Sequence, residues 1–149
     1  LAYFLTWTTY GTWLPGDERG WVRHGEGSSQ VPYRRADARL RAVARKSLRH
    51  AAVRLSGKQR DFVARSIRRS CLVRGRRMLA LSVLSNHVHV ILRADDESPE
   101  RVMVFLKAYA SRSLNAEFGK QRWWTRHGST RWINGQQSLR AAQQYVRDQ

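Results

Sequence analysis

The 149-residue sequence contains few residues that could cross-link or interrupt a fold, with one cysteine and three prolines. The single cysteine, Cys71, excludes an internal disulfide and any zinc site built from several cysteines, and it fits a reducing cytoplasm. Long apolar runs are missing too. The longest, Met78 to Leu92, is broken by Ser85 and Asn86, so we predict no transmembrane segment and no membrane partner. No signal peptide is recognisable either.

Acidic residues are scarce, because 11 Asp and Glu stand against 28 Lys and Arg, which gives a net charge of +17. Such a charge attracts polyanions, and nucleic acid is the commonest polyanion that a protein meets. Arginine dominates the basic set and suits planar contacts with phosphates and bases. We therefore expect a nucleic-acid partner and a cytoplasmic, nucleoid-associated location.

Hydrophobic residues make up 42% of the chain, which excludes wholesale disorder. The length predicts one domain over residues 1–149. Because the sequence starts at Leu1 rather than Met and stops inside an apparent helix, we expect that a C-terminal segment has been cut away.

Hydrophobic periodicity and turn residues predict the elements in order. They are a strand at 2–9, a long loop at 10–32, helices at 34–50 and 58–73, strands at 77–84 and 87–93, a helix at 99–118, a short strand near 131–133, and a last helix at 139–149 capped by Ser138. Ser98 and Pro99 mark the start of the third helix and Gly119 its end. This order predicts an α+β fold, a ferredoxin-like βαββαβ antiparallel sheet with helices on one face plus a C-terminal helix.

The stretch SNHVHVIL, residues 85–92, contains two histidines one residue apart. On a strand, residues i and i+2 point to the same face, so His87 and His89 project together while Val88 and Val90 point into the core. Neutral imidazole is the commonest metal ligand, so the pair could form half a metal site. The alternative is that two partly exposed histidines lie on a sheet face without a ligand.

The last predicted helix could supply the rest of such a site. Tyr145 and Gln149 are four residues apart and share a helix face. A tyrosine hydroxyl beside a metal-bound phosphate is a usable nucleophile, although Tyr145 could also simply pack. Gln149 would add a neutral oxygen ligand, and this ligand set suits Mg²⁺ or Mn²⁺ better than structural zinc.

At these residues the sequence resembles a known family. His87-Val88-His89 is similar to the HUH motif of single-tyrosine nucleases, and the YVRDQ stretch at 145–149 resembles the YxxxQ helix of insertion-sequence transposases in that superfamily. FLTWTTYGTWLPGDERGWV and FLKAYASRSLN resemble the REP-associated tyrosine transposases. The resemblance runs in order along nearly the whole chain.

The resemblance implies a single-stranded DNA transposase that cleaves and rejoins hairpin sites. Tyr145 would attack a phosphodiester to leave a 5′-phosphotyrosine and a free 3′-hydroxyl, with the metal on His87, His89 and Gln149. Relatives commonly carry a further C-terminal segment and are often homodimers. It stays open whether Tyr145 serves its own chain or a partner.

Further residues are candidates for DNA contact. Tryptophans beside basic groups can stack on single-stranded bases, and Lys107 matches a lysine of the family helix. The candidates are Trp13, Arg19, Trp21, Lys107, Arg126 and His127.

Three other functions stay open. A replication or conjugation initiator would use the same chemistry, but the chain is short for one. A non-catalytic module that binds single-stranded nucleic acid would leave the histidines and Tyr145 without a role. A metal-free RNA endonuclease on this fold would need a histidine base and no tyrosine.

Overall fold

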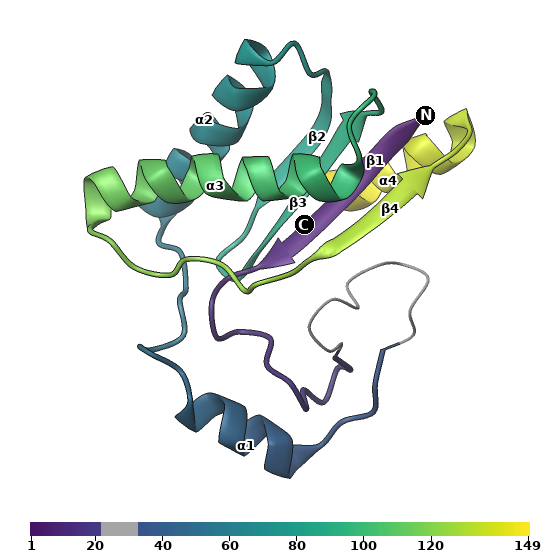
Figure 1. Cartoon of the computed structure of the whole chain (residues 1–149). Coiled ribbons are helices and arrows are strands. Elements are labelled where there is room, and N and C mark those ends of the chain that lie inside the picture. Colours follow the sequence, from purple (N-terminus) through teal and green to yellow (C-terminus); the bar gives the residue numbers. More distant parts are fainter. Residues whose placement is uncertain (22–32) are drawn as a thin grey trace.

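A computed structural model describes residues 1–21 and 33–149 of the chain, so the part of the predicted long loop at 22–32 lies outside the described residues. The elements follow the predicted order (Figure 1). They are β1 (Ala2–Thr8), α1 (Ala38–Lys46), α2 (Gly57–Val73), β2 (Met78–Val83), β3 (His87–Arg93), α3 (Pro99–Phe118), β4 (Ser129–Ile133) and α4 (Gln136–Arg147).

The four strands form one antiparallel sheet in the order β2-β3-β1-β4. β1 lies in the centre and pairs with β3 on one side and β4 on the other. This is the strand order of a βαββαβ fold in which each helical connection returns the chain to the sheet. The predicted fold class is therefore confirmed.

The sheet has a different cover on each face (Figure 1). Helices α2 and α3 cover one face, where the main core gathers around buried residues such as Leu5, Val88 and Leu106. Helix α4 covers part of the other face over a small core of Ala2, Ile91, Ile133 and Val146, and α1 lies apart, below the sheet in Figure 1. Successive side chains of each strand point to opposite faces of the sheet, and this alternation separates the two cores.

Side-chain caps fix several helix ends where the sequence predicts them. The Ser98 side chain accepts a hydrogen bond from the Arg101 backbone at the start of α3, and Gly119 ends that helix with a φ of 94°. The prediction that Ser138 caps the last helix is wrong. Helix α4 begins at Gln136 after Gly135, whose φ of 92° turns the chain without a side-chain cap.

The first helix is shorter than predicted. It spans Ala38–Lys46 rather than 34–50, because Asp37 caps it and Ser47 ends it. The following segment extends along the protein, where the Val53 amide donates to the Tyr10 carbonyl at 2.8 Å and the Leu55 amide donates to the Ser85 carbonyl at 2.7 Å. Val53 and Leu55 are buried, so tertiary contacts hold the segment between the two helices in an extended form.

Lys107 of α3 forms hydrogen bonds with the segment that leads into β4. Its ammonium donates to the carbonyls of Thr125 at 2.7 Å and His127 at 3.3 Å. Burial lowers the pKa of Lys107 to about 8, since a charged ammonium loses hydration there. Among the described helices, none combines the length and hydropathy needed to cross a bilayer.

Gly128 is expected to tolerate no side chain. An added Cβ would lie 2.5 Å from the Thr6 carbonyl oxygen and 2.7 Å from the Met103 sulfur. We predict that Gly128→Ala lowers the free energy of unfolding by about 1–3 kcal/mol through overpacking, as measured by urea denaturation. Gly57→Ala is the control, since its nearest atom would be 3.7 Å away in the first turn of α2. Equal stability of the two variants would contradict the prediction.

The depressed pKa of Lys107 predicts a pH dependence of stability. The folded state releases this proton near pH 8, whereas the unfolded chain keeps it to its ordinary pKa. Stability should therefore rise as pH rises through this window. We expect the unfolding free energy of the native protein, relative to Lys107→Met, to increase by about 1 kcal/mol between neutral pH and about pH 9. A constant difference between the two proteins would contradict the burial of a charged ammonium.

Candidate functional site

The two histidines lie on the face of the sheet that α4 partly covers. His87 pairs with Thr8 and His89 pairs with Thr6 across β1 and β3, and cross-strand partners in an antiparallel pair share a face. The imidazole centroids are 4.6 Å apart. The strand therefore places two ligand-type rings side by side, with hydroxyl side chains on the neighbouring strand.

Each imidazole is held through its Nδ1 atom. Nδ1 of His87 donates to the Asn86 side-chain oxygen at 2.7 Å, and a 2.8 Å hydrogen bond joins Nδ1 of His89 to the Thr6 hydroxyl. Nε2 of His89 is buried and has no hydrogen-bond partner among the described residues. Such anchoring leaves Nε2 as the atom that a ligand would meet.

Both histidines are held in the neutral form. Burial lowers the pKa of His89 to about 4, with a smaller contribution from His87. Burial, followed by the positive charge of Arg19, lowers the pKa of His87. Neutral imidazole has the free lone pair that metal binding needs.

Tyr145 reaches this pair from α4 of the same chain. The helix packs on β2 and β3, where Val146 is buried and the Gln143 amide donates to the Leu79 carbonyl at 3.1 Å. The Tyr145 ring centroid lies 5.5 Å from that of His89 and 6.2 Å from that of Phe4. Its side chain is 52% exposed, so the phenol lies beside a buried imidazole and stays open to a substrate.

Gln149 lies two residues past the end of α4. Its amide nitrogen donates to the Tyr145 carbonyl at 3.2 Å, an arrangement that keeps the side chain beside its own helix end. The structure thus brings together three of the four predicted residues, His87, His89 and Tyr145. The role of Gln149 as a ligand stays a prediction.

The donor set fits a divalent metal only in part. Among the described residues, no three His, Cys, Asp or Glu side chains cluster as a metal site would require. The orphaned Nε2 of His89 and the two anchored imidazoles nevertheless fit the histidine half of such a site. An amide oxygen and substrate oxygens would have to complete it.

The predicted DNA contacts from the first loop lie beyond His87. Arg19 stacks on Trp13 at 4.1 Å and forms an ion pair with Asp17. The Trp13 indole donates to the Gly20 carbonyl, and the Trp21 indole donates to the Arg35 carbonyl. Both indole N–H groups are thus used within the protein.

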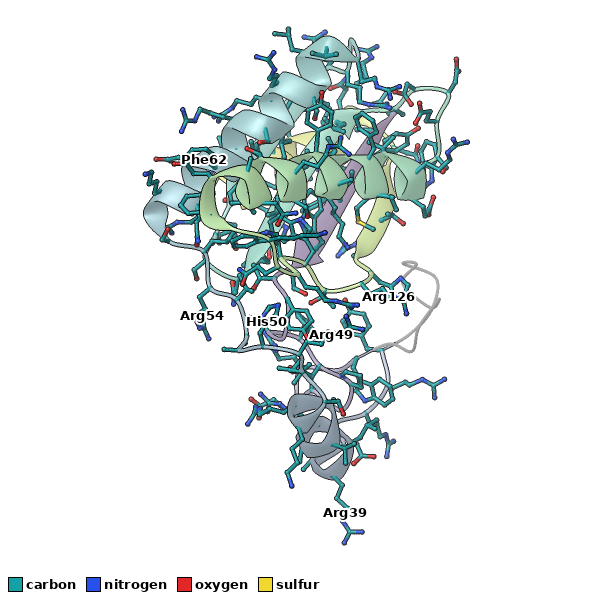
Figure 2. All side chains as sticks on the ribbon, turned by 60° about the vertical axis from the view of Figure 1, so that its left-hand side comes forward. Arg39, Arg49, His50, Arg54, Phe62 and Arg126 are labelled. Carbon is teal, nitrogen blue, oxygen red and sulfur yellow. The ribbon has the colours of Figure 1, made fainter. Side chains whose placement is uncertain are left out.

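The remaining DNA candidates cluster around the segment before β4. Lys107 is engaged with the Thr125 and His127 carbonyls, so its ammonium supports this segment instead of pointing freely to solvent. Arg126 is exposed on that segment, as Figure 2 shows. Contact of these residues with DNA stays a prediction.

Sequence reasoning missed three residues around the histidines. Thr6 and Asn86 orient the imidazoles, and exposed Arg131 shares the histidine face because it pairs with Phe4. The alternation of TWTT in β1 gives the shared face of Thr6 and Thr8. The strand register that places Thr6 beside His89 follows only from the folded sheet.

A basic groove of about 510 Å³ lies between the first loop and α1. Its lining includes Arg41, Arg45 and Arg54, with His50 beside them. Figure 2 shows His50, Arg54 and Arg126 between the sheet and α1. This is the end of the sheet at which β3 begins (Figure 1). Guanidinium groups gathered in this way suit the phosphates of nucleic acid.

Two solved structures resemble this one. A protein assigned as a transposase from Deinococcus radiodurans R1 has a TM-score of 0.52 and 18% identity, with 99% of this chain and 89% of that chain covered. A REP-associated tyrosine transposase bound to a REP hairpin has a TM-score of 0.54 and 12% identity, with 97% of this chain and 63% of that chain covered. At these identities the likeness shows the fold alone.

Sequence comparison identifies the family. No curated protein matches the sequence. The family model described as "Transposase IS200 like" matches residues 37–149, more than half of the chain and the part that carries both histidines, Tyr145 and Gln149. The chain therefore belongs to the IS200-like transposase family.

Proposed function

We propose that this transposase cleaves and rejoins single-stranded DNA through a covalent bond to Tyr145. The observation that carries the proposal is the packing of the Tyr145 ring 5.5 Å from His89, whose Nε2 atom has no partner among the described residues. A nucleophile and two neutral imidazoles on one face of the sheet, with a basic groove at the end of that sheet, are parts that phosphodiester transfer can use.

The reaction is a transesterification. The Tyr145 phenol oxygen attacks the phosphorus atom and the bond from phosphorus to the 3′ oxygen breaks, so the 5′ phosphate becomes attached to tyrosine and a 3′-hydroxyl is freed. The phenol proton passes to solvent, and the leaving oxygen takes a proton from solvent. Attack by the 3′-hydroxyl on the phosphotyrosine reverses these steps and rejoins the strands.

His87 and His89 would hold Mg²⁺ or Mn²⁺, with Gln149 as a further oxygen ligand. The bound ion would supply charge stabilisation at the phosphoryl oxygens. Thr6 and Asn86 keep the imidazoles in place through Nδ1, and Phe4 packs against the Tyr145 ring. The protein thus contributes positioning, which is a large part of the catalytic effect in such sites.

A DNA hairpin is the proposed substrate. The structural neighbour bound to a REP hairpin shares this fold, and the charge of +17 supplies the electrostatic attraction. The packing of α4 on its own sheet supports a site completed within one chain.

The covalent intermediate can be detected directly. We predict that a labelled pool of DNA hairpins with randomised single-stranded arms forms an adduct with the protein in Mn²⁺, seen on a denaturing gel. Tyr145→Phe should abolish the adduct because the nucleophile is gone, whereas Tyr109→Phe on α3 should keep it. His87→Ala and His89→Ala should also abolish it while hairpin binding persists.

Each alternative gives another pattern in this assay. Specific binding without any adduct would indicate a non-catalytic module. Cleavage that persists in EDTA and in Tyr145→Phe would indicate a metal-free nuclease. Normal cleavage by both histidine variants would overturn the metal site.

Thr6 provides a second test of the histidine site. Thr6→Val removes the hydroxyl that holds Nδ1 of His89, so we predict about a 10–100-fold loss of Mn²⁺ affinity, measured by the EPR signal of free Mn²⁺. Thr130→Val is the matched control, because that hydroxyl faces the other side of the sheet and donates to Glu100 at 2.9 Å. Unchanged affinity in Thr6→Val would argue against binding of the metal by His89.

A further inference from the structure

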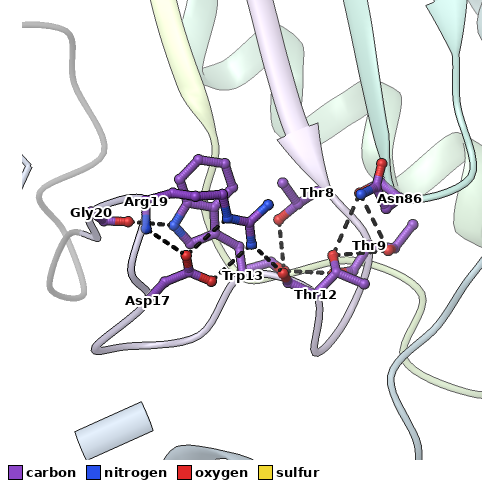
Figure 3. A network of polar contacts seen from close by, with 9 residues as sticks. Thr8, Thr9, Thr12, Trp13, Asp17, Arg19, Gly20 and Asn86 are labelled. Atoms are coloured by element: carbon purple, nitrogen blue, oxygen red, sulfur yellow. Dashed lines mark hydrogen bonds and ion pairs between the residues drawn. The ribbon is translucent and has the colours of Figure 1, made fainter. Parts of the chain in front are cut away.

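Arg19 is held rigidly for an exposed arginine. Its Nε and Nη2 atoms each donate to Asp17 at 2.8 Å, and Nη2 also donates to the Thr12 carbonyl at 2.7 Å. The Trp13 ring covers the guanidinium at 4.1 Å. Asp17 is 1% exposed, and its hydrogen bonds to Arg19 lower its pKa, so the anchor stays ionised. Figure 3 shows this arrangement.

This arginine differs from a buried structural arginine. Arg76 is 5% exposed on its side chain and pairs with two carboxylates, Asp95 and Glu97. Arg19 pairs with one carboxylate, its side chain is 45% exposed, and Nη1 makes no hydrogen bond to the residues that the structure describes. A charged group fixed on one edge and open on the other is prepared to bind an anion.

A chain of hydrogen bonds connects Arg19 to Asn86 (Figure 3) and from there to His87. Thr12 accepts from Arg19, the Thr12 amide donates to the Thr9 carbonyl, and the Thr9 amide donates to the Asn86 carbonyl. Asn86 in turn holds His87.

Tyr145 and Arg19 approach the histidines from opposite ends. Along β3 the order is His87, His89 and Ile91, and Tyr145 contacts His89 and Phe4, the partner of Ile91. Arg19 lies at the other end, beyond His87. In phosphoryl transfer the attacking and leaving oxygens are roughly in line. A phosphate on the histidines would therefore expel its leaving oxygen toward Arg19.

The basic groove continues from that point. Thr12 lines it together with Arg41, Arg45 and Arg54. The Arg41 Nε atom is buried and has no hydrogen-bond partner among the described residues, and Arg41 acts on Asp17 electrostatically. Thr12 thus connects the anchored arginine to the basic groove.

We propose that Arg19 and this groove bind the DNA strand that ends in the freed 3′-hydroxyl, and so retain that strand for rejoining. The inference rests on the proposed function, because it assigns the leaving strand of the Tyr145 reaction to one side of the site. Arg19 is a positioning residue, whose effect falls on release and rejoining more than on attack by tyrosine.

The test follows separately the two DNA fragments that cleavage produces. The hairpin pool carries one dye at each 5′ end and another at each 3′ end, and the adduct is isolated without denaturation. In the native protein the 3′-end dye should stay covalently bound, and the 5′-end dye should dissociate slowly. Arg19→Gln should release the 5′-end dye about tenfold faster through loss of a charge-assisted contact, and rejoining should fall accordingly.

Three variants separate this role from a structural one. Asp17→Asn with Arg19→Gln removes the buried charge as well, and it should show the same fast release while keeping a native unfolding midpoint. Arg19→Lys should be intermediate, since it keeps the charge without the fork geometry. Arg69→Gln, an exposed arginine of α2, should behave as the native protein.

The outcomes are distinct. If the adduct forms and Arg19→Gln releases the 5′-end fragment at the native rate, the inference is wrong and the proposed function stands. An adduct that carries the 5′-end dye would overturn the assigned strand polarity. If the native protein forms no adduct, the proposed function fails, and the inference fails with it.

Discussion

The two-residue side-chain period of β3 is the constraint on which the site depends. Val88 and Val90 complete the core beneath α2 and α3, so His87 and His89 must project to the opposite face. On that face His89 contacts the Thr6 hydroxyl and the Tyr145 ring that α4 brings, and His87 contacts the Asn86 side chain. Burial of the valines in the main core and placement of the imidazoles on the opposite face are therefore two results of one alternation.

Three parts of the fold contribute residues to the site: the sheet, helix α4 and the loop after β1. The sheet holds the histidines, α4 adds Tyr145 at one end, and the loop after β1 adds Arg19 at the other. Buried Asp17 gives that loop a defined geometry, since an ionised carboxylate out of water must keep its partner. In the proposed reaction the nucleophile and the basic groove would lie on opposite sides of the phosphate, which would give the reaction a direction along the DNA strand.

Local sequence signals predicted the elements well where packing agrees with them. β3 and α3 have the expected bounds, because strand alternation and the Ser98, Pro99 and Gly119 signals are short-range. The segment after α1 could not be predicted, since Val53 is held by a backbone contact with distant Tyr10. Likewise the spacing of the histidines predicts a shared face, whereas the approach of α4 to that face depends on tertiary contacts. The family assignment is confirmed, and the catalytic roles stay predictions.

The central claim is that one chain supplies both the imidazoles and the phenol. It can be tested by mixing Tyr145→Phe chains with His89→Ala chains after reversible unfolding and assaying the mixture for the covalent DNA adduct, with native chains treated in the same way as the positive control. The account predicts that the native control forms the adduct and the mixture forms none, because no single chain in the mixture holds both groups. Recovery of adduct in the mixture would show that the tyrosine acts on a partner's histidines and would contradict the account.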